Sequence, residues 1–335
     1  MRSLTIPKDY SSKLSSRETQ KAIKKVKEIV QLNLSQALKL ERVTAPIIVT
    51  QESGINDNLS GVERTVAFTM KEIEGTAEVV QSLAKWKRCA LHKYGYPAGE
   101  GIYTDMNAIR RDDSVDNIHS IFVDQWDWES VITKEQRNTE FLYETVRKIV
   151  AAIASAKDEI NKQFPVLKHQ ICRDVFFITS QELEDMFPDM TSKERENIMV
   201  KKYGTVFISQ IGCKLKSGNK HDDRAPDYDD WSLNGDILFY NPVLDNALEL
   251  SSMGIRVDAQ SLMSQLEEDQ KTDRLKYPYH QDIVGNVLPL TIGGGIGQSR
   301  VCMLLLEKAH IGEVQVSIWP EDMVQKCKEA GIYLL

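Results

Sequence analysis

The extended segments of this chain come in runs and do not alternate strictly with helices. VAFTM, AEVVQS, GIYTDMNAI and SIFVDQW lie between residues 66 and 126, and DVFFITS, TVFISQI, DILFYN and ALELSSMGIRV lie between residues 174 and 257. A doubly wound parallel sheet needs a long crossover, usually a helix, between strands, whereas an antiparallel sheet does not. The order of segments therefore predicts an α+β fold with a largely antiparallel sheet flanked by helices.

Two long helices are expected to flank this sheet. The first covers about residues 15–40 and opens with a capping box at Ser15. The second covers about residues 133–160 and opens with Thr133 and Gln136 at the same spacing. Both carry apolar residues at helical spacing, so each should bury one face.

The domain organisation follows from what the chain lacks. No repeat, low-complexity tract or Pro/Gly/Ser linker divides the 335 residues, so we expect a single catalytic domain over residues 1–335, with its weakest boundary at the polar loop 214–234. Pro46 interrupts the β-branched segment 40–50. Because proline cannot donate to a ladder, this segment is predicted to be an edge or interface strand.

Composition excludes several classes of function. A net charge of -7 argues against a broad nucleic-acid-binding surface. The five cysteines form no CxxC pair, and the histidines form no metal or triad motif, so neither a zinc site nor covalent catalysis is indicated. The N-terminus lacks the apolar core of a signal peptide, and no run approaches the ~18 apolar residues of a membrane span. We expect a cytoplasmic protein with no nucleic-acid or membrane partner.

The segment TIGGGIGQSRVCMLLL, residues 291–306, has the composition of a nucleotide site. Its glycines, which include Gly293 and Gly295, allow the backbone to approach a ligand closely. Arg300 falls in the first turn of the following helix, where a guanidinium can stack on a base or pair with phosphate. Taken alone, the segment is more typical of a plain connection between a strand and a helix.

A dense acidic cluster follows residue 224. If DILFYN and ALELSS pair, residues 236 and 251 fall opposite one another, and Asp236 and Glu249 become diagonal neighbours on one face. Two facing carboxylates repel unless a cation lies between them, and Mg²⁺ carrying ATP phosphates fits that description. The alternative is a solvated acidic face on which Asp229 and Asp230 only form turns.

Basic residues stand out at two places. SLAKWKR sets three cations around one tryptophan, and we expect Lys87 to point inward while the others face solvent. Arg110 ends the extended run GIYTDMNAI and would suit a phosphate, although a charged hairpin tip is the commoner arrangement. Asp57, considered alone, is typical of a turn.

The segment VDQWDWE predicts a strand with two unlike faces. Gln125 and Asp127 share one face, and Trp126 and Trp128 share the other. A polar face in the middle of a sheet requires an explanation beyond the packing of a core.

Taken in order, these segments resemble the catalytic fold of class II aminoacyl-tRNA synthetases. The first helix with LERVTAPII resembles its first motif, with Pro46 at the dimer interface. IYTDMNAIRRDD resembles the second motif, with Arg110 as the α-phosphate arginine, and GGGIGQSR resembles the third, with Arg300 at ATP. Over nearly the whole chain, a more specific similarity is to the bacterial aspartate-ammonia ligase family. It rests on the segments NDNLSG, SLAKWKR, AGEGIYT, VDQWDWE, RAPDYDDW, LNGDIL and ELSSMGIRV.

The resemblance implies a homodimer that converts L-aspartate, ATP and ammonia to L-asparagine, AMP and diphosphate through a β-aspartyl adenylate. By motif position, aspartate would contact Asp57, Ser82, Lys87, Gln125, Asp127, Ser252, Arg256 and Gly293. The nucleotide would contact Arg110, Asp229, Asp236, Glu249, Gly295 and Arg300, with Mg²⁺ held by Asp236 and Glu249. The catalytic groups would be Arg110, Arg300, Asp57 and Asp127, and either of these two aspartates would orient ammonia or take its proton. Strict alternation from Glu249 places Arg256 on the wrong face, unless Gly254 introduces a bulge.

Two alternatives compete with this interpretation. An aspartyl- or asparaginyl-tRNA synthetase core would activate the α-carboxylate, but the chain has no room for an anticodon-binding domain and its acidic balance suits tRNA poorly. A catalytically silent paralogue would not need Arg110, Asp236, Glu249 and Arg300 together. Free ammonia is the expected nitrogen donor, because no glutaminase domain or N-terminal nucleophilic cysteine is visible.

Overall fold

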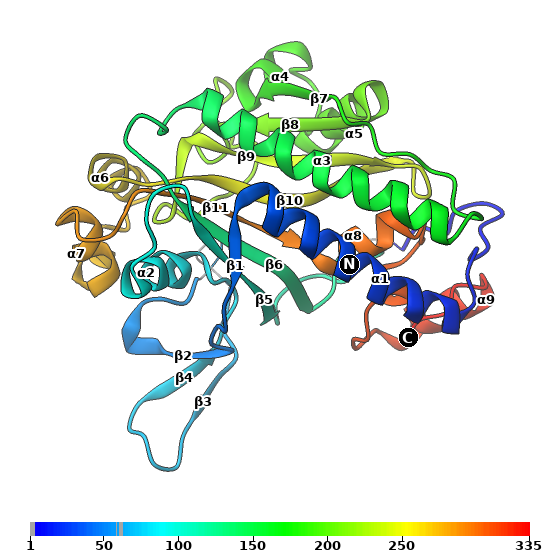
Figure 1. Cartoon of the computed structure of the whole chain (residues 1–335), viewed down its shortest axis with the longest axis horizontal. Coiled ribbons are helices and arrows are strands. Elements are labelled where there is room, and N and C mark those ends of the chain that lie inside the picture. The colour runs from blue at the N-terminus through cyan, green and yellow to red at the C-terminus, as the bar shows by residue number, and fades with distance from the viewer. Residues whose placement is uncertain (1–3, 58, 60–62) are drawn as a thin grey trace.

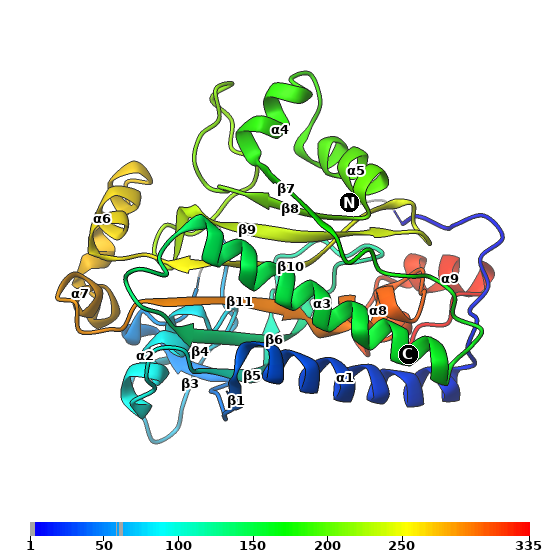
Figure 2. The same ribbon diagram turned by 45° about the horizontal axis from the view of Figure 1, so that its top comes forward.

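The computed structural model describes residues 4–57, 59 and 63–335, and its centre is an eight-stranded sheet (Figures 1 and 2). The strand order is β1-β5-β6-β11-β10-β9-β8-β7. The pairs β1–β5 and β7–β8 are parallel, and every other pair is antiparallel. In sheet order the strands are β1 (Leu40–Arg42), β5 (Gly101–Ile109), β6 (Phe122–Val131), β11 (Thr291–Gly297), β10 (Asn246–Arg256), β9 (Asp229–Asn241), β8 (Thr205–Ser209) and β7 (Val175–Thr179). This mixed, mainly antiparallel sheet confirms the predicted α+β class.

Two long helices, α1 (Ser16–Leu38) and α3 (Thr139–Gln163), lie side by side across one face of the sheet (Figure 2). The capping box at Ser15 is present, and α1 buries residues spaced four apart. The predicted start of α3 was wrong. Thr133 and Gln136 form a separate turn, and the helix begins after Asn138, whose side chain accepts the N–H of Phe141 and so caps it.

The other face is covered in two places. Near β7 to β9, the helices α4 (Ser180–Met186) and α5 (Ser192–Tyr203) pack on Val206, Ile208 and Leu238. At the opposite side lie α2 (Ala84–Tyr94), α6 (Ala259–Glu268) and α7 (Pro278–Val284), with α6 and α7 around Val257. The remaining elements are α8 (Gln298–Leu305), α9 (Glu321–Glu329) and the 3-10 turns η1 (Gln51–Ser53), η2 (Thr272–Lys276) and η3 (Ile311–Glu313).

The segment 40–50 is divided between two sheets. β1 is an edge of the large sheet, and β2 (Ile48–Thr50) is an edge of a three-stranded sheet with β4 (Thr76–Val79) and β3 (Ala67–Thr69), which projects from the body in Figure 1. Pro46 lies between the two strands, where no ladder needs its missing N–H. The prediction of an edge segment is therefore confirmed.

The register between β9 and β10 differs by one residue from the expected one. Ser252, not Ser251, lies opposite Asp236, because β10 carries an extra residue between Glu249 and Ser251. This bulge keeps Glu249 and Ser252 on one face with Asp236.

The same bulge resolves the position of Arg256. Beyond it the strand alternates regularly against β11, so Ser252, Gly254 and Arg256 share one face. The bulge that we expected at Gly254, which brings Arg256 to the cavity face, thus occurs before Ser251. A second irregularity follows Gly254, but there the extra residues belong to β9.

Over the described residues, no helix has the length and apolar character needed to cross a bilayer.

Replacing Gly294 by alanine should destabilise the sheet. A Cβ at this position would lie 2.5 Å from the Met253 Cβ and 2.7 Å from the Ser252 carbonyl oxygen. We expect Gly294→Ala to lower the free energy of unfolding by about 1–3 kcal/mol, measured by urea titration. Gly285→Ala is the matched control, because its Cβ meets nothing closer than 3.2 Å, and it should cost less than about 1 kcal/mol. Equal effects of the two substitutions would contradict this account.

Candidate active site

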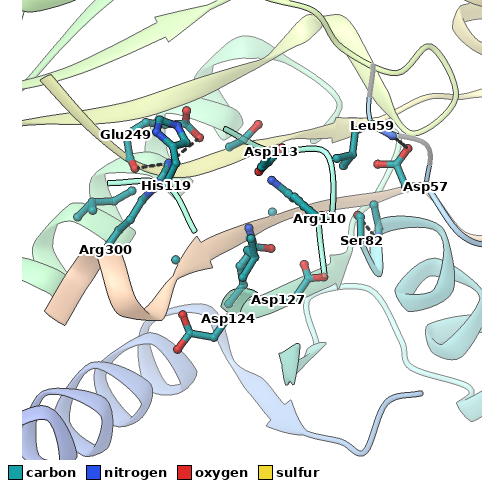
Figure 3. A pocket seen from close by; sticks show the side chains of 18 of the residues that line it. Asp57, Leu59, Ser82, Arg110, Asp113, His119, Asp124, Asp127, Glu249 and Arg300 are labelled. Carbon is teal, nitrogen blue, oxygen red and sulfur yellow. Dashed lines mark hydrogen bonds and ion pairs between the residues drawn. The ribbon is translucent and has the colours of Figure 1, made fainter. Parts of the chain in front are cut away.

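A cavity of about 450 Å³ opens on the face of the sheet opposite α1 and α3, over β6, β11 and β10 (Figure 3). Most of the side chains selected from the sequence line it. They are Asp57, Ser82, Lys87, Arg110, Gln125, Asp127, Asp229, Glu249, Ser252, Arg256, Gly295 and Arg300. Gly293 and Asp236 are not among its lining residues; they lie next to residues that are.

The glycines form a strand in the middle of the sheet. A Cβ at Gly295 would lie 2.2 Å from Gln125 Oε1, and one at Gly293 would lie 2.6 Å from Arg256 Nη2. The bare backbone of β11 therefore makes room for side chains that reach over it from β6 and β10. As predicted, α8 follows directly, with Arg300 in its first turn.

Two buried cations lie at the floor of the cavity, and each has carboxylate partners. Lys87 is 1% exposed, forms an ion pair with Asp127, and lies 3.9 Å from Glu129. Arg256 pairs with Asp229 and donates through Nη2 to Glu129 Oε2 at 3.0 Å. Burial lowers the pKa of Lys87, and the two carboxylates near it only partly offset that effect.

The inward position of Lys87 confirms the prediction, but the expectation that its neighbours face solvent was wrong. Lys85 and Arg88 are also buried. The Lys85 ammonium lies 2.8 Å from an Asp227 oxygen, and Arg88 donates to the carbonyl oxygens of Val257 and Pro289 at 2.7 and 2.9 Å. Helix α2 thus meets acceptors on several sides, which its own sequence does not reveal.

Asp229 and Asp230, which in isolation are typical of turns, belong to strand β9 and are buried. Asp229 pairs with Arg256, and Asp230 pairs with Arg137. The interpretation of this stretch as a solvated acidic loop was therefore wrong, because arginines from other elements compensate its charges.

Asp57 lies at one end of the cavity, close to Ser82 (Figure 3). Its Oδ1 accepts the N–H of Leu59 at 3.0 Å, and its buried Oδ2 has no hydrogen-bond partner among the described residues. Burial raises the pKa of Asp57 to about 6, assisted by Asp227 and opposed by Lys85 and Arg110. The rest of the motif NDNLSG lies largely outside the described residues.

Arg110 directly follows β5 and lines the cavity. Its guanidinium reaches into the space between Asp113 and Asp127 in Figure 3. Within the described part of the chain, its buried Nε has no hydrogen-bond partner. A buried donor of this kind at a cavity wall suits an anionic ligand. An arginine at an ordinary charged hairpin tip would instead be expected to face solvent.

Arg300 lies at the other end of the cavity beside Glu249 and His119 (Figure 3). Its Nη1 donates to the Glu249 carbonyl oxygen at 3.0 Å and lies 3.9 Å from the carboxylate, and its Nε donates to the Ile118 carbonyl oxygen at 3.3 Å. Burial raises the pKa of Glu249, but the charges of Arg300, Arg224 and Lys193 together lower it by more, so the net shift is downward.

Asp236 and Glu249 are the pair proposed to hold a metal. Asp236 is paired with Arg224, while its buried Oδ1 has no partner within the described residues. Burial, opposed by Arg224 but reinforced by the neighbouring Glu249, raises the pKa of Asp236. Two like charges on one face and one unsatisfied oxygen fit a cation such as Mg²⁺. Across the described ranges no three His, Cys, Asp or Glu residues cluster as ligands, so phosphate and water would complete its shell.

Several cavity residues were not selected from the sequence. Arg224, His119, Asp124 and Gln315 come from loops or strand ends, where no periodic pattern marks the inward side chain. Glu129 could have been selected from the sequence, because strand alternation places it on the same face as Asp127. Its carboxylate accepts a hydrogen bond from Arg256.

Replacing Asp57 by asparagine should stabilise the protein at neutral pH. The raised pKa means that folding disfavours the charged carboxylate, a penalty that is complete above about pH 6 and disappears as the pH falls toward 4. We expect Asp57→Asn to raise the free energy of unfolding at pH 8 by about 1–3 kcal/mol, with a smaller gain at pH 5. Urea titrations at both pH values measure this. The exposed Glu72→Gln control should stay within about 0.5 kcal/mol at both, and a pH-independent loss in Asp57→Asn would refute the account.

Comparison with known proteins gives one family. The family model described as aspartate-ammonia ligase matches residues 17–331. A protein of Clostridium perfringens strain SM101 named aspartate--ammonia ligase is 57% identical over 336 residues, covering 100% of both chains. A protein of the same name from Ligilactobacillus salivarius is 56% identical, covering 99% of each.

Solved structures agree on the fold. The asparaginyl-tRNA synthetase of Pyrococcus horikoshii, complexed with asparaginyl-adenylate, matches with a TM-score of 0.63 at 16% identity, over 90% of this chain and 70% of that one. The corresponding complex from Entamoeba histolytica gives 0.60 at 16% identity, over 89% and 66%. At this identity the likeness concerns the fold alone, and it supports the class II synthetase architecture.

Proposed function

Since the chain belongs to the aspartate-ammonia ligase family, we propose that the cavity over β6, β11 and β10 is its active site. The enzyme uses ATP to join ammonia to the side-chain carboxylate of L-aspartate, and it releases L-asparagine, AMP and diphosphate by way of a β-aspartyl adenylate. The observation that carries the assignment of the site is its arrangement of charge. Buried cations lie along a cavity that also holds a carboxylate oxygen of Asp57 for which the described residues provide no hydrogen-bond partner.

Lys87 and Arg256 are proposed to bind the carboxylates of aspartate. Both are buried at the floor and already oriented by carboxylates of the protein. Asp127, with Ser82 and Gln125, would receive the α-ammonium group. A bound aspartate therefore brings a negative charge to Lys87 and a positive charge to Asp127, which preserves the balance of the pair.

Other residues near the floor have supporting roles in this proposal. Ser252 faces the cavity beside Gly295, whose missing side chain leaves room for Gln125. Gly293 lies beneath Arg256 and leaves room for its guanidinium. Asp229 was assigned to the nucleotide by motif position, but its bond to Arg256 favours a role in orienting that arginine.

Arg110 and Arg300 are proposed to neutralise the phosphates of ATP. Attack by the aspartate side chain on the α-phosphate gathers negative charge, and preformed guanidinium groups stabilise that charge without reorganisation. Asp236 and Glu249 would hold Mg²⁺, which when bound neutralises further phosphate charge.

Asp57 is the better supported of the two candidates for handling ammonia. Asp127 is engaged with Lys87, whereas Asp57 keeps one oxygen without a partner among the described residues. A pKa near 6 allows Asp57 to accept a proton from the attacking nitrogen at neutral pH. Ammonia then displaces AMP, and the proton passes to the carboxylate.

We also propose that the enzyme is a cytoplasmic homodimer. The support is the resemblance of α1, β1 and the segment around Pro46 to the first class II motif. Analytical ultracentrifugation of the purified protein tests the dimer.

The reaction is tested by its products. With aspartate, ATP, Mg²⁺ and ammonium, we expect asparagine and an equal amount of AMP, with no ADP. Aspartate labelled with ¹⁸O in its β-carboxylate should transfer one labelled oxygen to the phosphate of AMP, because the adenylate bridges through that oxygen. AMP formation only on addition of tRNA would indicate a synthetase, and no turnover would indicate a binding protein.

Arg110 and its exposed neighbour Arg111 provide a matched pair. Arg110→Ala should lower kcat/KM for ATP by about 100- to 1,000-fold, because it removes a phosphate contact in the transition state. Arg111→Ala should change it less than about threefold, as expected for a surface substitution. Initial-rate measurements at varied ATP check both. Similar losses in the two variants would argue against a specific role for Arg110.

A further inference from the structure

The loop between β5 and β6, residues 110–121, forms one wall of the cavity and is anchored from outside by Asn117. This side chain is 5% exposed and does not line the cavity. Its Oδ1 accepts the N–H of Thr5 at 2.7 Å, and its Nδ2 donates to the carbonyl oxygens of Thr5 at 2.8 Å and Ala309 at 2.9 Å. Its own carbonyl oxygen accepts the N–H of Ile311 at 2.7 Å.

Asn117 therefore joins three parts of the chain that are far apart in sequence. Thr5 belongs to the N-terminal segment, residues 4–14, and Ala309 and Ile311 follow α8. The N-terminal segment is itself held firmly, because Tyr10 donates to Glu313 at 2.9 Å and Lys13 pairs with Glu307. The segments to which Asn117 donates its hydrogen bonds are therefore themselves held in place.

Ile118, the residue next to Asn117, contacts Arg300, which we propose to bind ATP. The Ile118 carbonyl oxygen accepts the Nε–H of Arg300, and Ile118 and Ile311 both line the cavity. Arg300 thus donates one hydrogen bond to the loop and another to the Glu249 carbonyl oxygen. A shift of the loop would change the direction of the guanidinium.

We propose that Asn117 is a positioning residue for the nucleotide: by tying the loop to Thr5 and Ala309, it holds the Ile118 carbonyl against Arg300. The N-terminal segment is then a structural part of the ATP end of the cavity, although it is not among the residues that line it. This inference rests on the proposed contact of Arg300 with ATP.

The first test is the separation of two Michaelis constants. Asn117→Ala should raise KM for ATP about tenfold, because three hydrogen bonds, one buried and two partly buried, are lost, while KM for aspartate changes less than about twofold. Asn161→Ala is the matched control. Its Nδ2 donates to the His169 carbonyl oxygen at 2.9 Å, away from the cavity, and both constants should stay unchanged.

A second variant guards against a folding defect in Asn117→Ala. Thr5→Pro removes the N–H that Asn117 accepts and keeps the carbonyl oxygen to which Asn117 donates, in a segment outside the sheet, and it should raise KM for ATP about threefold. In the double variant the two effects should not add, since both act through the same bond. Full additivity, or equal rises in both Michaelis constants, would overturn the proposal.

Arg300→Ala separates this inference from the function on which it rests. If Arg300→Ala leaves KM for ATP unchanged, the proposed role of Arg300 fails. If Arg300→Ala raises it and both Asn117→Ala and Thr5→Pro do not, only the positioning role of Asn117 fails.

Discussion

The buried ion pairs at the cavity floor are the interaction on which the site depends. Lys87 on α2 and Arg256 on β10 pair with carboxylates from β6 and β9, so these contacts link four elements. Leaving one charge of such a pair without its partner costs several kcal/mol. The elements therefore cannot shift independently, and the floor has one geometry before any ligand arrives. In the binding that we propose, a charged substrate would exchange partners with groups that are already oriented.

The sheet accommodates this network through two backbone features. β11 lacks side chains where Gln125 and Arg256 cross it, which allows an amide and a guanidinium to lie over the centre of the sheet. The extra residue in β10 places Glu249 on the same face as Arg256, seven positions further along the strand. Without that bulge, alternation would direct one of the two into the apolar layer below α1 and α3.

The sequence predicts the repetitive parts of this structure well, because period and capping are local. The capping box of α1, the two faces of β6 and the helix start before Arg300 depend on neighbouring residues only. One local signal misled, because the capping pattern at Thr133 belongs to a turn before α3. The other errors lie where distant residues decide. Lys85 and Arg88 are buried because Asp227 and two carbonyl groups surround them, and Asp229 is a strand residue because Arg256 compensates its charge.

The candidate site shows the same division. Most of the residues selected by motif position line the cavity, whereas the loop residue His119 and the arginine that pairs with Asp236 have no signal of their own in spacing or alternation. The register of β10 was missed by one residue, since a bulge depends on how two strands meet. Strand pairing is a property of tertiary structure, and a single strand does not encode it.

The place of β11 in the sheet has a consequence for folding. This strand is the last of the sheet to be synthesised, yet it lies between β6 and β10 and joins the β1-β5-β6 half to the β10-β9-β8-β7 half. Until residue 297 is available, each half presents an unpaired edge toward the other, and such edges are prone to pair with other chains. Closing the gap requires contacts between segments more than 150 residues apart, which slows folding. The glycines that shape the cavity thus belong to the strand that completes the sheet, so the sheet and the cavity are completed in the same step.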